Sequence, residues 1–311
     1  MPHELCWLSA QEIGFHPVGD MSLSPHQIRV RTHLTRLRHG VDLSPCGGAS
    51  ERDCPQALQA WGVADVLEAG AAVKRFAPGD RVFGPMRHAD RQVLEERSLF
   101  PMSSFSNRHE FSTFIDAGMT ALHCIHLSRL RFGDRIAVWG LGVVGLMAMQ
   151  YALASGAREI IAVDPIESRR KIAQNLGAHL MAPEWPQDHA CIDAAVVCSD
   201  SPNALRQATH SLQPESALVV ASSKLYFDEV SSLERIIREK NLQHCAARDE
   251  APPPDLYDRV QYSIITKRVV VWPIISHYVP FEQAPAVCPQ ICQNPSEYIQ
   301  VLFTYGGLAR A

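Results

Sequence analysis

The spacing of apolar residues along the chain changes near residue 115. Before that point, short apolar runs are separated by turn-forming residues. Residues 28–32 alternate between apolar and polar side chains, as expected for a half-buried strand. Residues 66–70 and 80–83 predict two further strands, separated by a turn at Pro78-Gly79. Many turns and few helical repeats predict a partly open β-barrel or a small sandwich for this part.

Strands and helices alternate from about residue 115 to about residue 245. The alternation begins with a helical periodicity over residues 114–127, and it predicts a parallel sheet with crossover helices. Residues 250–255 contain three consecutive prolines, which favour a linker or an exposed loop. Residues 269–272 then predict a strand, and residues 280–305 a loop, a helix and a final strand.

Length and composition are those of an ordinary globular protein with two domains. The chain has 311 residues, of which 46% are hydrophobic and 20% charged. A net charge of −4 gives no electrostatic argument for nucleic acid or an anionic membrane as the main partner, so we expect a small-molecule substrate and neither of these partners. Because the chain shows no apolar run of about 20 residues and no leader pattern near residue 1, we expect a cytoplasmic protein.

The cysteines do not show the spacing of a disulfide framework or of a zinc site. There are nine, an odd number, their spacing is irregular and no C-x-x-C pair occurs. Cys191 and Cys198 flank or lie in an apolar run that predicts a strand. We therefore expect reduced and mostly buried thiols, and no structural zinc ribbon.

A glycine-rich turn between a predicted strand and a predicted helix is the strongest local signal. The pattern G-x-G-x-x-G in this context is typical of dinucleotide-binding folds. Gly140 permits a tight turn, Gly142 lets the backbone approach a pyrophosphate at the helix N-terminus, and Gly145 allows close packing of helix on sheet. The predicted cofactor loop comprises Gly140, Leu141, Gly142, Val143, Val144 and Gly145.

The next predicted strand ends in an acidic residue that supports the same interpretation. Asp164 lies near the spacing of about 20 residues at which a carboxylate holds the adenosine ribose hydroxyls. Its charge favours NAD, although Arg169 or Arg170 could pair with the 2′-phosphate of NADP, so NADP stays possible. Ser199 follows another buried strand, where a ligand in the crevice would lie. A turn role for Asp164, a solvated arginine and a plain loop serine are the structural alternatives.

Several motifs in their order along the chain resemble those of the medium-chain dehydrogenase/reductase superfamily, which includes the alcohol and polyol dehydrogenases. The resemblance covers nearly the whole chain. It rests on residues 76–82 (FAPGDRV), 88–90 (HAD), 116–123 (DAGMTALH), 280–285 (PFEQAP) and 294–298 (NPSEY).

The resemblance implies a fold, a domain organisation and an assembly. It implies a doubly wound parallel Rossmann sheet and a discontinuous, β-rich catalytic domain like that of GroES. The expected boundaries are catalytic domain over residues 1–114, Rossmann domain over 115–247 and the rest of the catalytic domain over 248–311. It also implies a homodimer or homotetramer.

The chain departs from the family where zinc-dependent members carry their metal ligands. His39 stands in place of the first ligand, a cysteine, and Val41 in place of the hydroxyl residue that relays a proton. The segment Gly62-Val63-Ala64 lacks the second ligand, a histidine, and its glutamate, and Asp116 stands at the third position. His39 and Asp116 alone cannot supply three protein ligands, so we expect no catalytic zinc.

A zinc-free enzyme needs a protein group to give or take a proton. Histidine titrates near neutral pH and suits this task. The candidates lie in segments that the family places around its cleft, and each has a structural alternative as a helix cap or a core histidine. They are His39, Asp42, His88, Asp116 and His123.

Three functions remain open at this stage. The first is zinc-independent interconversion of a secondary alcohol and a ketone on a small polar or cyclic metabolite, with hydride transfer to or from NAD(P). The second is NAD(P)H-dependent reduction of an activated C=C bond. The third, from another class, is a cofactor-binding protein that has lost catalysis.

Overall fold

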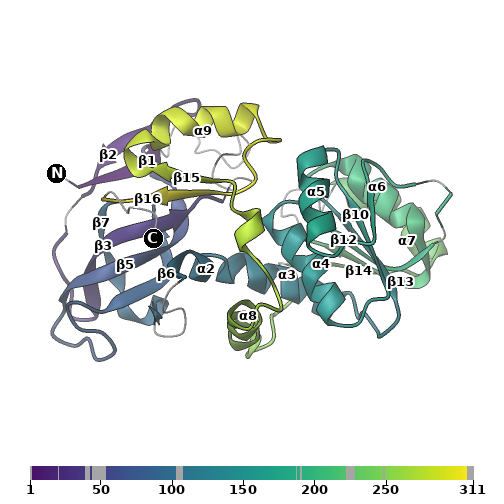
Figure 1. Cartoon of the computed structure of the whole chain (residues 1–311), viewed down its shortest axis with the longest axis horizontal. Helices are drawn as coiled ribbons and strands as arrows, with labels where there is room; N and C mark the ends of the chain where they lie inside the picture. Colours follow the sequence, from purple (N-terminus) through teal and green to yellow (C-terminus); the bar gives the residue numbers. More distant parts are fainter. Residues whose placement is uncertain are drawn as a thin grey trace. The chain divides into compact units, whose positions relative to one another are not determined.

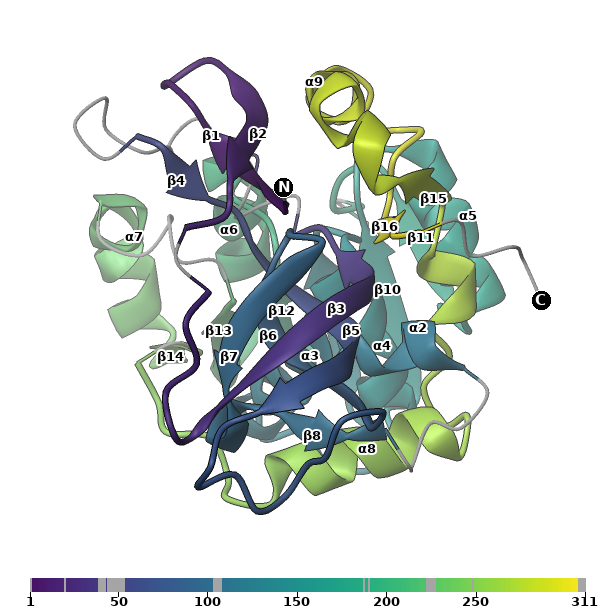
Figure 2. The same ribbon diagram turned by 90° about the vertical axis from the view of Figure 1, so that its left-hand side faces the viewer.

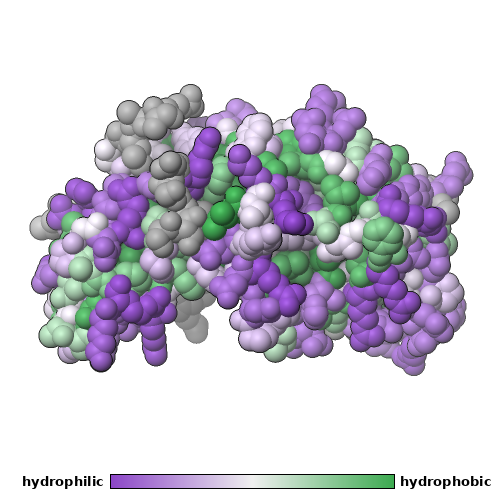
Figure 3. Space-filling model, turned by 60° about the horizontal axis from the view of Figure 1, so that its bottom comes forward, coloured by the Kyte–Doolittle hydropathy of each residue, from purple (hydrophilic) through white to green (hydrophobic). Residues whose placement is uncertain are grey.

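The computed structural model describes residues 2–19, 21–38, 43, 54–102, 108–186, 188–189, 191–221, 228–247 and 249–306. The chain divides into two compact units, one formed by residues 1–114 and 275–311 and the other by Ile115–Ile274. Among the described residues, no helix is long and apolar enough to cross a membrane. The face drawn in Figure 3 is mainly hydrophilic, with hydrophobic residues in scattered patches.

The first unit is built mostly of strands from both ends of the chain. Its strands are β1 (His3–Trp7), β2 (Ile13–Pro17), β3 (Gln27–Arg36), β4 (Gln56–Ala57), β5 (Gln59–Ala69), β6 (Arg81–Arg87), β7 (Arg91–Glu95), β8 (Phe100–Pro101), β15 (His277–Pro280) and β16 (Val301–Thr304). Its helices are α2 (His109–Ser112), α9 (Ala284–Gln293) and the short 3₁₀ turns η2 (Glu96–Ser98) and η5 (Phe281–Gln283).

Most of these strands form one sheet. The order is β15-β16-β3-β5-β6-β8, with β7 also paired to β3, and β2-β1-β4 form a smaller sheet (Figure 2). Along β3, buried positions alternate with more exposed ones up to Thr32, as the sequence predicted, because one face of the sheet covers an apolar cluster that includes Ile28 and Val30. A second cluster combines Leu5 near the N-terminus with Phe303 near the C-terminus.

The second unit alternates strands and helices. Its strands are β9 (Arg135–Trp139), β10 (Glu159–Val163), β11 (Leu180–Ala182), β12 (Ile192–Val197), β13 (Leu212–Val220) and β14 (Gln243–Ala246). Its helices are α3 (Ile115–Leu127), α4 (Val143–Ala154), α5 (Glu167–Asn175), α6 (Pro202–Ser211), α7 (Asp228–Glu239), α8 (Leu256–Ile265) and the turn η4 (Trp272–Ile274).

The six strands described in this unit form a parallel sheet in the order β11-β10-β9-β12-β13-β14. This is the doubly wound order in which the direction of winding reverses beside the first strand, here β9. Ligands of such sheets bind in the crevice at the carboxyl ends of the strands, next to that reversal. The predicted α/β fold with a doubly wound parallel sheet is confirmed.

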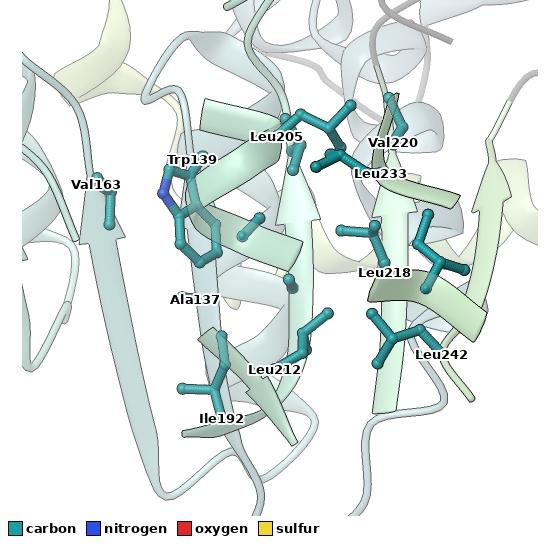
Figure 4. Packing of buried hydrophobic residues seen from close by; sticks show 14 of the residues in the cluster. Ala137, Trp139, Val163, Ile192, Leu205, Leu212, Leu218, Val220, Leu233 and Leu242 are labelled. Atoms are coloured by element: carbon teal, nitrogen blue, oxygen red, sulfur yellow. The ribbon is translucent and has the colours of Figure 1, made fainter. Parts of the chain in front are cut away.

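Apolar residues hold the helices on this sheet. Trp139 and Ala137 of β9 pack with Leu205 of α6 and Leu233 of α7 (Figure 4). Successive side chains of a strand point to opposite faces, so the fully apolar strands bury both of their faces. Helices α3 and α4 pack against each other on the other side of the sheet from α6 and α7 (Figure 1).

Two sequence predictions differ from the structure around residue 270. Residues 248–274, which we expected in the catalytic domain, group with the Rossmann unit, because α8 packs on α3. The strand predicted for residues 269–272 is wrong. The buried Gln150 amide binds the backbone of Val270 instead, accepting from its N–H at 2.7 Å and donating to its carbonyl at 3.2 Å.

The cysteine prediction holds only in part. The eight cysteines in the described part of the chain are all free thiols. Three of them are buried, namely Cys6, Cys124 and Cys288. Cys191 and Cys292 are exposed, so burial is less general than the apolar surroundings in the sequence predicted.

Candidate cofactor site

Gly140 forms the sharp turn that follows β9. Its φ of +86° lies in the left-handed region that favours glycine. A Cβ at this position would lie 2.9 Å from the carbonyl oxygen of Cys198 and 3.0 Å from the Cβ of Ser199. The turn is therefore closed to any side chain by both its backbone conformation and its neighbours.

The other two glycines of the motif have opposite surroundings. A Cβ at Gly145 would lie only 1.9 Å from the carbonyl oxygen of Gly140, so helix α4 can approach the turn only without a side chain there. A Cβ at Gly142 would meet nothing within 4 Å. Gly142 caps the N-terminus of α4 without a side-chain hydrogen bond, and the first amides of a helix lack intrahelical acceptors. The open space thus lies where an anion would meet a helix N-terminus.

Asp164 connects the end of β10 to the glycine loop. Its side chain is only 3% exposed. One carboxylate oxygen accepts a hydrogen bond from the backbone N–H of Leu141 at 2.7 Å, and the other from that of Ile166 at 2.8 Å. Charge-assisted bonds of this kind are stronger than neutral ones. Asp164 therefore braces the loop between two neighbouring strands in addition to presenting an acid there.

The two arginines named from the sequence both contact Asp164. The Arg169 guanidinium lies 3.8 Å from the carboxylate, and its side chain is mostly buried. The Arg170 guanidinium donates a hydrogen bond to the backbone carbonyl of Asp164 at 2.6 Å. Both cations are thus held at the carboxyl end of β10, where the sequence analysis placed the choice between NAD and NADP.

Ser199 lies beside the turn at Gly140. It follows β12, and its hydroxyl accepts a hydrogen bond from the backbone N–H of Ser201 at 3.1 Å. Ser201 in turn caps α6. The bonded hydroxyl fixes the loop that closes one side of the glycine turn.

All nine residues predicted to bind the cofactor therefore lie at one edge of the sheet. They follow β9, β10 and β12, which are neighbours in the order of strands. Val143 and Val144 form the first turn of α4 and are half-buried. Sequence reasoning missed Cys198, whose carbonyl lies against Gly140 and whose Cβ lies 3.5 Å from the Cβ position of Gly145. Its place directly after the apolar run of β12 is the signal that could have found it.

Comparison with known proteins finds a family match within this unit. The family described as zinc-binding dehydrogenase matches residues 143–260. That range begins at α4, directly after Gly142, and ends within α8. Residues 143–260 are thus similar to a zinc-binding dehydrogenase domain.

Curated relatives extend the likeness beyond the dehydrogenase domain. (R,R)-butanediol dehydrogenase of Bacillus subtilis is 25% identical over 215 residues, which cover 58% of this chain and 62% of the relative. D-guloside 3-dehydrogenase of Escherichia coli K12 is 30% identical over 186 residues, covering 51% of this chain and 53% of the relative. The matches thus span little more than half the length of these relatives.

Solved structures match over the whole length. The crystal structure of 2R,3R-butanediol dehydrogenase from Bacillus subtilis has a TM-score of 0.79 at 17% identity, covering 98% of this chain and 99% of its own. An alcohol dehydrogenase from Escherichia coli CFT073 in complex with NADH has a TM-score of 0.80 at 14% identity, covering 97% and 99%. The resemblance to medium-chain dehydrogenases inferred from the sequence is confirmed.

Two of the predicted catalytic residues lie in the Rossmann unit but in different surroundings. Asp116 lies in the first turn of α3 and is half-buried. His123 lies on the same helix and is buried, and its Nε2 binds the backbone carbonyl of Glu250 at 3.1 Å. Its Nδ1 is buried and has no hydrogen-bond partner in the described part of the chain. His123 therefore anchors the proline-rich loop, the structural role that the sequence analysis left open.

His88 lies in the other unit and is fully buried. Its Nδ1 shares a hydrogen bond of 2.7 Å with the Thr35 hydroxyl, which lies 3.1 Å from the hydroxyl of Tyr305. Its ring packs edge-on against Phe303. Burial, reinforced by the charges of nearby arginines, lowers the pKa of His88 to about 3. His88 is therefore neutral near pH 7 and resembles a core histidine more than an acid that faces a substrate.

The remaining catalytic candidates, His39 and Asp42, lie outside the residues that the structure describes, as does Val41. Within the described ranges, no three His, Cys, Asp or Glu side chains come together as metal ligands. Val63 and Ala64, which occupy the segment of a missing ligand, are fully buried apolar residues of β5. Neither of these two side chains can coordinate a zinc ion.

Proposed function

We propose that this protein is an NAD(P)-dependent oxidoreductase that interconverts a secondary alcohol and a ketone on a small polar or cyclic metabolite, without a catalytic zinc. The single observation that carries the proposal is the open space at Gly142 in front of the N-terminus of α4. The names of the relatives, a butanediol dehydrogenase and a guloside dehydrogenase, support an alcohol as the substrate. We also expect a homodimer or homotetramer.

The residues at the edge of the sheet fit a dinucleotide. The first amides of α4, next to Gly142, would hold the pyrophosphate. The Asp164 carboxylate would accept hydrogen bonds from the ribose hydroxyls and would repel a 2′-phosphate, which favours NAD. Arg169 and Arg170 are both engaged by Asp164, so neither is available to a 2′-phosphate without giving up that contact. NADP stays possible, because either arginine could exchange its partner.

The protein's own contribution to the reaction is positioning and a path for a proton. A bound nicotinamide supplies or accepts the hydride. The proton of the alcohol must then move to or from a protein group, because no metal is proposed to stabilise the alkoxide. His39 is the first choice for this group, since it stands in the segment where the family places a metal ligand. Asp116 is the second choice.

Titration with NADH tests the cofactor proposal. We expect binding with a Kd of micromolar order, followed by fluorescence. A Gly142→Val variant should fold, because its side chain enters open space, yet lose binding, because that space is the proposed pyrophosphate path. Gly19→Val is the matched control, since a Cβ at Gly19 also meets nothing within 4 Å. Absence of binding of both NADH and NADPH at millimolar concentration would overturn the proposal.

A substrate screen tests the reaction class. Secondary alcohols with NAD⁺ and ketones with NADH should change the absorbance of NADH, and product analysis should show an alcohol–ketone pair. Reduction of an activated C=C bond would give a saturated carbonyl product instead and would replace the proposed reaction. Binding of NADH with no turnover on any of these classes would favour a cofactor-binding protein. Elemental analysis should find no stoichiometric zinc, and chelators should leave activity unchanged.

A further inference from the structure

The most exposed large hydrophobic side chain in the described part of the protein is Phe132, at 93% of its possible surface. It lies on a tight turn before β9, at the opposite end of the strand from the glycine loop. The turn is held by a hydrogen bond of 2.9 Å from the Gly133 N–H to the Gly156 carbonyl. The Phe132 ring lies over Gly156, where a Cβ would come within 2.6 Å of it. Burial does not account for this aromatic side chain, whereas a backbone hydrogen bond fixes the turn that carries it.

A cavity of about 360 Å³ adjoins this turn. Leu130 and Ser155 line it, and they lie next to the turn and next to Gly156 respectively. Its walls also carry His126 near the end of α3, Arg129 just after that helix, and Arg259 of α8, which pairs with Asp255. A cavity lined by basic groups suits an anion, and it lies directly beside the exposed aromatic ring.

Cations outnumber anions around the turn. Arg129, Arg131 and Arg158 are all exposed, and no ion pair involves them among the residues described. Two of the nearby acids already have partners. Asp134 accepts a hydrogen bond from the backbone N–H of Arg131 at 2.7 Å, and Asp255 pairs with Arg259 at 2.7 Å.

We propose that this surface docks on an anionic lipid membrane. We call it the basic edge, formed by His126, Arg129, Arg131, Phe132, Leu153 and Arg158. Phe132 and the 41% exposed Leu153 would enter the boundary between headgroups and acyl chains. The arginines would face the anionic headgroups, and the cavity would receive a lipid phosphate.

The size of the apolar surface favours a membrane over a protein partner. A stable protein interface buries about 800 Å² on each side around an apolar centre, and two exposed apolar side chains are too few for that. Docking on a membrane requires less apolar surface, because each basic residue near an anionic surface contributes about 1 kcal/mol of binding free energy. An inserted aromatic side chain adds to this binding free energy. The charges and the aromatic side chain of the basic edge match these requirements.

The net charge of −4 does not oppose this docking. At physiological ionic strength, charges are screened beyond about 8 Å, so a membrane interacts with the charges of the nearby protein surface and not with the net charge of the chain. The sequence analysis used the net charge and therefore expected no membrane partner. The basic edge lies at the end of α4 that is remote from Gly142, and twelve helical residues span about 18 Å. Docking would therefore leave the cofactor loop accessible.

Sedimentation with vesicles tests the proposal. We expect the full chain to bind vesicles of phosphatidylcholine mixed with phosphatidylglycerol, not vesicles of phosphatidylcholine alone, and to be released by high salt. Replacing Arg129, Arg131 and Arg158 by Gln should weaken binding on the order of 100-fold, at about fivefold for each charge. Phe132→Ser should weaken it on the order of tenfold.

Matched variants outside the basic edge serve as controls. Arg235→Gln removes an exposed arginine from α7, and Tyr278→Ser removes an exposed aromatic from the other unit. Both should bind the mixed vesicles like the wild type, and circular dichroism with thermal unfolding should show that all variants fold. None of these readouts depends on cofactor or activity, so they can fail independently of the proposed function.

Three outcomes would overturn the proposal. The first is no binding to the mixed vesicles. The second is equal loss of binding in the control variants. The third is binding of polyglutamate, but not of vesicles, that the triple arginine variant abolishes, which would assign the surface to an acidic protein. Inhibition of vesicle binding by glycerol phosphate at millimolar concentration would support the cavity as the binding site of the lipid headgroup. No inhibition would mean that docking depends on the surface charges and not on the cavity.

Discussion

A buried ionisable residue has opposite surroundings in the two units. In the Rossmann unit, both carboxylate oxygens of Asp164 accept backbone N–H bonds, and a guanidinium lies close by. In the other unit, His88 has one bonded nitrogen, while its Nε2 is buried without a partner in the described structure. The first arrangement stabilises a charge, whereas the second excludes one. Burial alone therefore does not mark a functional acid or base; the bonding partners distinguish them.

The same difference appears in how well each region followed from the sequence. The cofactor residues were predicted from a spacing within one strand–turn–helix segment and the strand after it, and they meet at one edge of the sheet. His88 was predicted from a segment near the family's cleft, without knowledge of what surrounds it. Its neighbours Thr35 and Tyr305 come from distant parts of the chain. The following predictions test this contrast, from the largest expected effect to the smallest.

Gly145→Val should prevent folding of the Rossmann unit or destabilise it by several kcal/mol. A Cβ there would lie 1.9 Å from a backbone carbonyl, which cannot move aside as a side chain can. Urea denaturation and expression of soluble protein measure the effect, with Gly142→Ala as a control that should fold normally. A stable Gly145→Val protein would show that the approach of α4 to the turn is not fixed as described.

His39→Ala should lower turnover on the order of 10²–10⁴-fold with nearly unchanged cofactor affinity, because it would remove the proposed proton donor. Steady-state kinetics and NADH titration measure the two quantities separately. His26→Ala, which removes an exposed histidine, is the control. Wild-type turnover in His39→Ala would move the role to Asp116 before His88, since His88 is buried and neutral near pH 7.

Asp164→Ala should weaken binding of NADH and change the preference between cofactors. Loss of the charge removes repulsion of a 2′-phosphate, which should shift the ratio toward NADPH by about tenfold. Loss of the hydrogen bond to the Leu141 N–H should also weaken the binding of both cofactors, an effect that the sequence alone did not predict. Titrations with NADH and NADPH separate the two effects. Tighter binding of NADPH by the wild type would instead show that Arg169 or Arg170 sets the preference.

His88→Leu should reduce the dependence of stability on pH. The pKa of His88 is about 3 in the folded protein, below the ordinary value of about 6.5 in the unfolded chain. The unfolded state therefore binds more protons as the pH falls below 6.5, and the free energy of unfolding decreases between pH 6.5 and 3. Above pH 6.5, His88 causes no loss of stability.

Urea titrations of wild type and His88→Leu at pH 7.5 and pH 5 measure this effect. The variant should lose about 1 kcal/mol at pH 7.5, because the bond to Thr35 is gone, and should lose less additional stability on acidification. His26→Leu is the matched control and should retain the pH dependence of the wild type. An identical pH dependence in His88→Leu would contradict the depressed pKa.

Much of both units was predictable because the information is local in the sequence. An alternating pattern identified β3 in the first unit, and apolar runs identified β9, β10 and β12 in the Rossmann unit, since each strand's side chains report its own environment. The same reasoning failed at residues 269–272. Their side chains are apolar, as in a buried strand, but the exposed Trp272 begins a 3₁₀ turn, and the backbone of Val270 binds the side chain of Gln150, more than a hundred residues away.

The sequence by itself determined the glycine turn, the acid that follows the next strand and the apolar strands that bring them together, because these depend on neighbours within one or two elements. Tertiary structure decided the partners. It gave Asp164 two amides and an arginine, paired His88 with Thr35, and left Phe132 exposed beside Arg129 and Arg131. The physical reason is that the charge, burial and bonding of a side chain depend on distances between residues that the chain brings together only by folding.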